Sequence, residues 1–180
     1  TVSAAKKMRE AYQRDGGKHV VQVGHQAPST GHASDVRQFL ADPSRLGRVT
    51  AISMQMHRNT PVTKAQWSRK ALMTSDLTPE NVDWQEFLGS AAKIPFDANR
   101  FIHWRYFWDY SGGQMTNLGA HEIDIIQWFM QVPGPTAVSS TGGRFALKDH
   151  GETPDTQNAL FEYPGFTATW SHREAGAGPH

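Results

Sequence analysis

The chain contains no cysteine among its 180 residues, which excludes disulfides, thiolate nucleophiles and cysteine-ligated zinc. It also lacks an excess of either charge, because 18 Lys and Arg residues offset 17 Asp and Glu residues to a formal net charge of +1. Binding to nucleic acid or to an anionic membrane surface generally depends on a basic excess. We therefore expect neither a nucleic-acid partner nor thiol chemistry.

Long apolar runs are missing as well. No stretch reaches the roughly 18 apolar residues that a membrane-spanning helix requires, and the opening residues TVSAAKKMREAYQRDGG lack the apolar centre of a signal peptide. We therefore expect no membrane partner; the cytoplasm is the default compartment and the periplasm the alternative. The length suffices for one ordinary domain, or for a small domain plus part of another, with a buried core.

The N-terminal third alternates helical and extended patterns. Apolar residues at spacings of three and four predict a helix over 3–14, which a glycine pair ends. The β-branched run HVVQVG, residues 19–24, predicts a short buried strand. A second helix is expected over 34–40, and strict alternation predicts a strand with one buried side over 48–57.

The remainder of the chain predicts two helices and three strands. A stretch without periodicity, 58–78, indicates a long loop of the kind that is often functional. A short helix is expected within 78–89, with Thr78 or Asp83 as its N-cap, and a longer helix from 114 or 115 to 130. Consecutive strands separated by glycine turns favour an antiparallel sheet. These strands are expected at 136–147, 155–165 and 166–173.

The stretch GGQMTNLGAHEIDIIQWF, residues 112–129, concentrates the chemically useful groups. His121 lies four residues after Asn117, so both side chains share one helical face, and Gly119 removes bulk beside them. Asp124, three residues further on, can orient the imidazole and raise its basicity. These features favour a general acid–base role for His121, because imidazole exchanges protons near neutral pH. A polar core or edge residue is the other interpretation.

A metal site competes with the proton-transfer interpretation, because Glu122 lies next to His121 and Asp124 on the same expected helix. Helical zinc sites of the HExxH type place two histidines one turn apart, whereas this helix carries one. We therefore predict no metal site.

The run FIHWRYFWDY, residues 101–110, holds six aromatic side chains. Such a density is usual for core packing, with nearby arginines stacked on the rings or paired with Asp109. The alternative is a sugar platform, in which aromatic faces cover C–H surfaces and cations bind hydroxyls. Trp104, Arg105 and Tyr106 are the candidate substrate contacts on that interpretation.

Gly24, His25 and Gln26 stand at the end of the strand expected at 19–24. Open α/β sheets bind ligands at the carboxyl ends of their parallel strands, so these three residues are candidate cofactor contacts. A polar surface turn is the simpler interpretation, and both stay open.

With these residues in place, the chain resembles the Gfo/Idh/MocA family of oxidoreductases. The segment NRFIHWRYFWDYSGGQMTNLGAHEIDIIQWFM is similar to the family signature GG-x-(three)-D-x-G-x-H-x-x-D, with the WR-x-FWDY run of one subgroup before it. KHVVQVGHQ is similar to the last strand region of the nucleotide-binding half, and VDWQEFLGSAAKIPFDANRF to the insertion before the signature. The resemblance extends over nearly the whole chain and is most specific in its middle.

The resemblance implies an α+β fold with a large, mostly antiparallel sheet, helices on one of its faces and an open face that makes homo-oligomer contacts. It implies that residues 1–30 are the C-terminal remnant of a Rossmann dinucleotide-binding domain, and that 31–180 form a substrate-binding and oligomerisation domain. It also implies NAD or NADP as the cofactor and a sugar, polyol or cyclitol as the substrate, oxidised at a CH–OH group.

By the same resemblance, His121 matches the catalytic histidine and Asn117 occupies a position usually held by Asp. An amide can hydrogen-bond a substrate hydroxyl but cannot act as a carboxylate. Neither the family's G-x-G-x-x-G phosphate loop nor its E-K-P motif occurs in the 180 residues. We therefore expect a chain that lacks most of the nucleotide-binding half, binds NAD(P) poorly and is inactive alone. An NAD-dependent glycosidase and a non-catalytic oligomerising partner are the alternatives.

Overall fold

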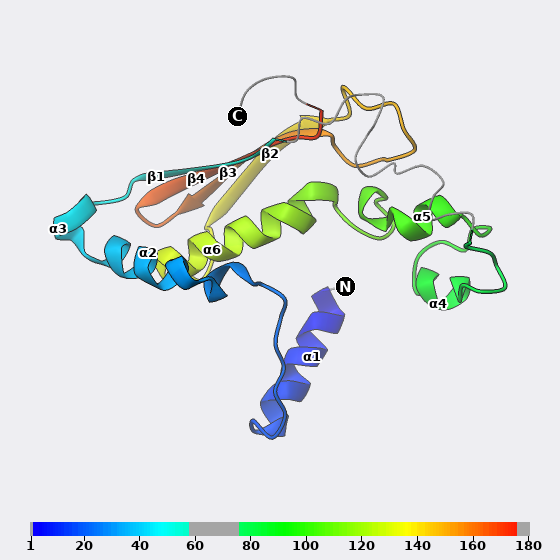
Figure 1. Cartoon of the computed structure of the whole chain (residues 1–180), viewed down its shortest axis with the longest axis horizontal. Coiled ribbons are helices and arrows are strands. Elements are labelled where there is room, and N and C mark those ends of the chain that lie inside the picture. Colours follow the sequence, from blue (N-terminus) through cyan, green and yellow to red (C-terminus); the bar gives the residue numbers. More distant parts are fainter. Residues whose placement is uncertain (1, 58–75, 176–180) are drawn as a thin grey trace.

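A four-stranded mixed sheet organises the chain (Figure 1). The structure, a computed structural model, describes residues 2–57 and 76–175. The strand order is β1-β4-β3-β2, with β1 parallel to β4 and the other two pairings antiparallel. The expected mostly antiparallel sheet of an α+β fold is therefore confirmed, with one parallel edge strand. The strands are β1 (Ala51–His57), β2 (Ala137–Gly143), β3 (Thr156–Tyr163) and β4 (Phe166–Arg173).

Alternation along β3 and β4 places their apolar side chains, apart from Leu160, on one face of the sheet. These side chains are buried, whereas the residues between them are exposed on the opposite face. Ile52 and Met54 of β1 pack against the same core. Burying one large apolar side chain stabilises a fold by roughly 1.5–3 kcal/mol, so this face supplies much of the stability. The buried set on β3 and β4 is Ala159, Phe161, Tyr163, Phe166, Ala168 and Trp170.

Helix α6 (Ala120–Met130) covers the apolar face of the sheet (Figure 1). Its Ile126 is buried in the core. A π-helical turn, η4 (Met115–Gly119), precedes α6, and the helix ends at Gln131, whose φ of 55° is left-handed. The long helix expected up to residue 130 is confirmed, and its first turn is π-helical.

Helix α2 (Gly31–Ala41) lies beside α6. Its Arg37 guanidinium stands 4.6 Å from the centroid of the Trp128 ring on α6. The expected second helix is confirmed, although it begins at Gly31, with Thr30 as its N-cap, three residues before the expected start. Two short elements flank α2: η1 (Ala27–Ser29) and α3 (Pro43–Leu46).

The N-terminal helix α1 (Val2–Asp15) has no buried residue and projects away from the sheet (Figure 1). The helix was expected, but the strand predicted at 19–24 is wrong. That stretch is irregular and exposed, with 95% of the Val20 surface accessible. β-branched residues form a strand only where a neighbouring strand can pair with them. Among the described strands none pairs with this stretch.

The aromatic region lies at the opposite end of α6 from α2 (Figure 1). Asp83 caps α4 (Trp84–Leu88) by accepting a hydrogen bond from the Glu86 backbone N–H at 2.9 Å, as one of the two expected caps. The helix α5 (Ala98–Ile102) and the single turn η3 (Trp104–Tyr106) follow. Core packing is confirmed for Tyr106 and Phe107, which are buried, whereas Trp108 is largely exposed.

Most of the loop expected at 58–78 lies outside the described residues. Within the described ranges, no helix is long and apolar enough to cross a membrane.

Candidate active site

His121 lies one residue inside the N-terminus of α6, directly after the π-helical turn. Such turns re-aim side chains and are frequent at functional sites. The His121 ring is half-buried, and its Nδ1 atom is shielded from solvent without a hydrogen-bond partner among the described residues. A shielded polar atom of this kind calls for a partner, such as a bound ligand or an ordered water. The Nδ1 atom is therefore available to a bound ligand or to an ordered water.

His25 is the nearest aromatic neighbour of His121 that the structure shows. The two ring centroids are 5.3 Å apart, and the planes are tilted by 49°. The His25 Nδ1 atom lies 3.2 Å from Asp124 Oδ2, close enough for an ion pair when the imidazole is protonated. The contact expected between Asp124 and His121 is thus made with His25 instead. Three candidate residues from two distant segments meet at one place on α6.

The other two candidate cofactor contacts flank His25. Gly24 is exposed in the irregular stretch before η1, and no heavy atom lies within 4 Å of where its Cβ would be. Gln26 is the exposed N-cap of η1. Both therefore lie at the surface on either side of His25 in the sequence.

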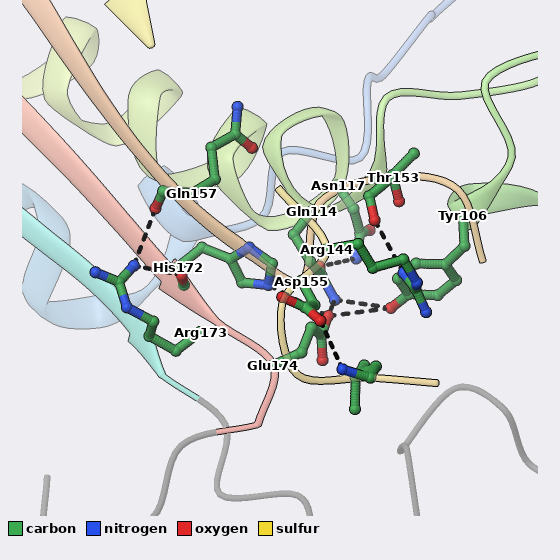
Figure 2. A network of polar contacts seen from close by, with 12 residues as sticks. Tyr106, Gln114, Asn117, Arg144, Thr153, Asp155, Gln157, His172, Arg173 and Glu174 are labelled. Carbon is green, nitrogen blue, oxygen red and sulfur yellow. Dashed lines mark hydrogen bonds and ion pairs between the residues drawn. The ribbon is translucent and has the colours of Figure 1, made fainter. Parts of the chain in front are cut away.

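Asn117 belongs to the π-helical turn and faces a buried polar network (Figure 2). Its Nδ2 atom donates to Gln114 Oε1 at 3.2 Å. Gln114 Nε2 in turn donates to the Tyr106 hydroxyl at 2.8 Å and to the Glu174 carboxylate. The Tyr106 hydroxyl also donates to Glu174 Oε1 at 3.3 Å. The network ties η3, the π-helical turn and the end of β4 together.

The three candidate substrate contacts divide between surface and interior. Trp104 is 37% exposed, and the Arg105 guanidinium stands 4.6 Å from the centroid of its ring. Tyr106 is buried, with its hydroxyl in the network around Glu174. Trp104 and Arg105 therefore form an aromatic and cationic pair at the surface, whereas Tyr106 faces inward.

Arg100 follows the packing interpretation of the aromatic run. Its guanidinium lies 4.4 Å from the centroid of the Phe107 ring and pairs with Asp109 at 3.3 Å and with Glu152 at 2.8 Å. Burial alone would lower the pKa of Arg100, but the negative charge of Glu152 raises it above its usual value. Arg100 therefore has a structural role.

A second carboxylate on α6, that of Glu122, joins the helix to the sheet. The Trp170 indole Nε1–H donates to Glu122 Oε2. Burial raises the pKa of Glu122 above its usual value, although the hydrogen bond from Trp170 acts in the opposite direction. Among the described residues, no group of three His, Asp or Glu side chains is arranged to hold a metal ion.

Residues 39–141 match the sequence profile of the oxidoreductase family Gfo/Idh/MocA, in its C-terminal alpha/beta domain. The match extends over more than half of the chain. The chain belongs to the Gfo/Idh/MocA family. No curated protein matches it in sequence.

Solved structures share the fold of this Gfo/Idh/MocA chain. One is the WlbA dehydrogenase from Bordetella pertussis in complex with NADH and UDP-GlcNAcA, at 16% identity and a TM-score of 0.60, covering 95% of this chain and 41% of that one. Another is GenD2 from gentamicin A biosynthesis in complex with NAD, at 17% identity and a TM-score of 0.64, covering 99% of this chain and 40% of that one. The chain thus spans about two fifths of their length, and at this identity the likeness concerns the fold.

The buried polar residues of this Gfo/Idh/MocA domain were not predicted from the sequence. His172 and Glu174 are fully buried, and their Nε2 and Oε1 atoms lie 3.4 Å apart. A signal was available: both continue the two-residue alternation of Phe166, Ala168 and Trp170 toward the core side, His172 within β4 and Glu174 one residue after its end. Polar residues on the apolar face of a strand require partners. Gln114 and Tyr106 provide them for Glu174, whereas neither ring nitrogen of His172 has a hydrogen-bond partner among the described residues.

Asp155 organises the loop between β2 and β3. Its carboxylate accepts hydrogen bonds from the backbone N–H groups of Phe145, Ala146 and Leu147, at 3.1, 2.9 and 2.7 Å. Burial would raise the pKa of Asp155, but these backbone donors together lower it below its usual value. Arg144, beside it, pairs with Asp149, and burial lowers its pKa.

Proposed function

We propose that the chain contains the substrate-binding part of an NAD(P)-dependent oxidoreductase that acts on a CH–OH group of a sugar, polyol or cyclitol. The main observation behind this proposal is that His121 Nδ1, in the first turn of α6, is shielded from solvent and has no hydrogen-bond partner among the described residues. The His121 ring lies beside His25, and the chain belongs to the Gfo/Idh/MocA family. In this proposal residues 1–30 belong to the nucleotide-binding domain and residues 31–180 to the substrate domain. Most contacts with the cofactor phosphates then come from outside the 180 residues.

The chemistry assigned to the chain's own residues is proton transfer and orientation. A bound nicotinamide would accept the hydride, and in this proposal Gly24, His25 and Gln26 would contact it. His121, as the neutral imidazole, takes the proton of the substrate hydroxyl as the C–H bond breaks. Asn117 accepts a hydrogen bond from a substrate hydroxyl. The Trp104 and Arg105 pair offers an aromatic face and a cation to the rest of the substrate.

The solved structures support this choice of ligand classes. The WlbA dehydrogenase was obtained with NADH and UDP-GlcNAcA, and GenD2 with NAD. Both proteins therefore accommodate a nicotinamide cofactor, and one accommodates a sugar nucleotide, on a fold that this chain shares.

Ligand binding by the chain tests the proposal. Saturation-transfer NMR with a panel of aldoses, polyols, cyclitols and UDP-sugars should detect at least one ligand, and His121→Asn should weaken its binding by about tenfold or more. His32→Asn, at an exposed position on α2, is the matched control and should leave binding unchanged. Absence of any ligand in the panel, or equal binding by His121→Asn, would contradict the role of His121. A parallel NADH titration by fluorescence should show no micromolar binding, and tight binding would contradict the domain assignment.

We also propose that the open face of the sheet makes a homo-oligomer contact. Leu160 on β3 is exposed on this face and, with Ser53 and Thr169, lines a shallow hollow of about 590 Å³. Small polar side chains let two sheets approach closely. Light scattering should show a dimer or higher oligomer that Leu160→Arg dissociates and that Leu46→Arg, at an exposed position on α3, does not. A monomeric wild-type chain would overturn this assignment.

A further inference from the structure

The buried amide of Gln114 stands between a carboxylate and the candidate site (Figure 2). Gln114 and Glu174 are 2% and 1% exposed, so water cannot substitute for either partner. On one side Gln114 Nε2 contacts Glu174 Oε1 and the Tyr106 hydroxyl; on the other, Gln114 Oε1 faces Asn117 Nδ2 at 3.2 Å. The chain of contacts runs from the end of β4 to the π-helical turn.

The chemistry of Glu174 fixes the orientation of every amide in this chain of contacts. An ionised carboxylate accepts hydrogen bonds and donates none, so Gln114 must turn its NH₂ group toward Glu174. Gln114 then presents its carbonyl oxygen to residue 117. Asn117 can satisfy that oxygen only with its own NH₂ group, which leaves Oδ1 as its outward acceptor. Within the described part of the chain, Oδ1 of Asn117 makes no hydrogen bond and is not sealed from solvent.

We propose that Glu174 and Gln114 are positioning residues that fix the Asn117 amide with Oδ1 available to a substrate hydroxyl, and that they exclude a carboxylate from position 117. The presentation to substrate rests on the proposed function, whereas the exclusion of a carboxylate is a property of the folded chain alone. This relay of contacts, from Glu174 through Gln114 to Asn117, explains why residue 117 is Asn here although the family signature has Asp.

An aspartate at 117 would meet a repulsion in either orientation of Gln114. With the present orientation, a carboxylate oxygen of residue 117 would face Gln114 Oε1, and two acceptors would oppose each other. If Gln114 rotated to donate to the new aspartate, its Oε1 would face Glu174 instead. The conflict is removed when residue 174 can donate, as Gln can. Gln114 then turns around, and the same number of hydrogen bonds forms in the reverse direction.

A charge exchange between positions 117 and 174 tests the relay. Asn117→Asp in the full chain should raise the unfolding equilibrium constant about tenfold, because buried acceptors are left opposed. In the Glu174→Gln background the same substitution should change that constant about twofold or less, since the reversed relay satisfies it. Urea titrations of the wild type, both single variants and N117D/E174Q give the coupling free energy between positions 117 and 174. A purely structural role for Glu174 predicts additive effects, and additivity would overturn the proposal.

Asn158→Asp is the matched control. Asn158 Oδ1 accepts from Ser171 Oγ and from Arg173 Nη2 on the same sheet, so a carboxylate oxygen suits this position. Asn158→Asp should change the free energy of unfolding by the same amount with Glu or Gln at position 174. If position 158 were coupled to position 174 as strongly as position 117 is, the relay would not be specific to residue 117.

A second measurement decides the question if Asn117→Asp does not fold. In the wild-type chain, the Asn117 side-chain NH₂ should exchange its protons with water slowly, because Gln114 Oε1 holds it. Gln114→Met keeps the side chain's length but removes the acceptor, so the exchange should accelerate about tenfold or more. Unchanged exchange in Gln114→Met would overturn the relay. Both experiments work without ligand, so their outcome is separate from that of the sugar and NADH titrations.

Discussion

Asp124 Oδ2 lies 3.2 Å from His25 Nδ1, so a carboxylate on α6 contacts an imidazole from the segment between α1 and α2. The i, i+3 spacing on the helix favoured His121 as the partner of Asp124. The imidazole that takes this place comes from a distant part of the sequence and has its ring centroid 5.3 Å from that of His121. The candidate site is therefore assembled from two segments, and Asp124 joins them.

The first prediction concerns this junction. Asp124→Asn keeps the shape of the side chain but removes the charge that attracts His25. Both side chains are about one third exposed, so the free energy of unfolding should fall by less than about 1 kcal/mol. The segment that carries His25 should nevertheless open more often, and trypsin should cleave after Lys18 several times faster. Glu10→Gln, exposed on α1, is the control. Unchanged cleavage would show that Asp124 does not hold the segment.

The second prediction concerns Asp155, whose carboxylate holds three backbone N–H groups. Asp155→Ala should lower the free energy of unfolding by about 3 kcal/mol at neutral pH, because buried donors lose their acceptor. The pKa of Asp155 is lowered in the folded chain, so its contribution is present above the ordinary value of 3.8 and is lost as the pH falls through the folded value. The difference between wild type and variant should therefore stay constant above about pH 5 and shrink below it.

Urea titrations between pH 2.5 and 7 measure this difference, with Asp35→Ala on the exposed side of α2 as the control for loss of a carboxylate. A difference that grew on acidification would contradict the role given to Asp155.

The sequence correctly predicted the elements whose residue periodicity reflects burial. The prediction was wrong where contacts with distant parts of the chain determine the local structure. Alternation predicted β1, strand-like runs separated by glycine turns predicted β3 and β4, and an apolar stripe predicted α6. The stretch 19–24 has strand composition but no strand beside it, which composition cannot reveal. The π-helical turn was not predicted either, since it depends on how residues 115–119 meet the sheet. The alternation of β4, extended by one residue, includes His172 and Glu174, but their polarity concealed that both face the core.

The candidate site shows the same division. The helix spacing predicted that His121 and Asp124 would share α6, and the run VGHQ indicated His25 as a ligand contact. The meeting of these residues at one place depends on the path of the chain from α1 to α2, which no local pattern encodes. Tyr106 was grouped with Trp104 and Arg105 by proximity in sequence, but a single turn of η3 points its side chain inward.

The third prediction concerns Gly113, whose φ of 66° suits glycine. A Cβ atom here would lie 2.6 Å from Thr153 Oγ1 and 2.7 Å from Thr153 Cβ, and Thr153 is fully buried. Gly113→Ala should therefore lower the free energy of unfolding by about 3 kcal/mol through backbone strain and overpacking. Gly112→Ala is the control, because its Cβ would meet only the end of the exposed Thr116 side chain. Urea denaturation should give the smaller loss for position 112, and the reverse order would contradict the packing described.

The fourth prediction concerns Glu122, whose carboxylate accepts the Trp170 indole N–H while half-buried. Burial raises its pKa, so the folded chain holds the proton more tightly than the unfolded chain does. Stability is therefore lost as the pH rises from the ordinary value of 4.5 through the folded value. Glu122→Gln keeps an acceptor for Trp170 without the charge, and should raise the free energy of unfolding at pH 7 by a few tenths to about 1 kcal/mol.

The pH dependence separates this effect from a general gain in stability. Below about pH 4 the carboxyl group of Glu122 is neutral in both states, so the advantage of Glu122→Gln should vanish there. Glu162→Gln, exposed on the outer face of β3, removes one negative charge without changing a buried contact and should show no such difference. Thermal denaturation of the three chains at pH 4 and pH 7 makes the comparison. If Glu122→Gln were less stable than the wild type at pH 7, the ionised carboxylate would contribute more through its bond to Trp170 than its burial costs.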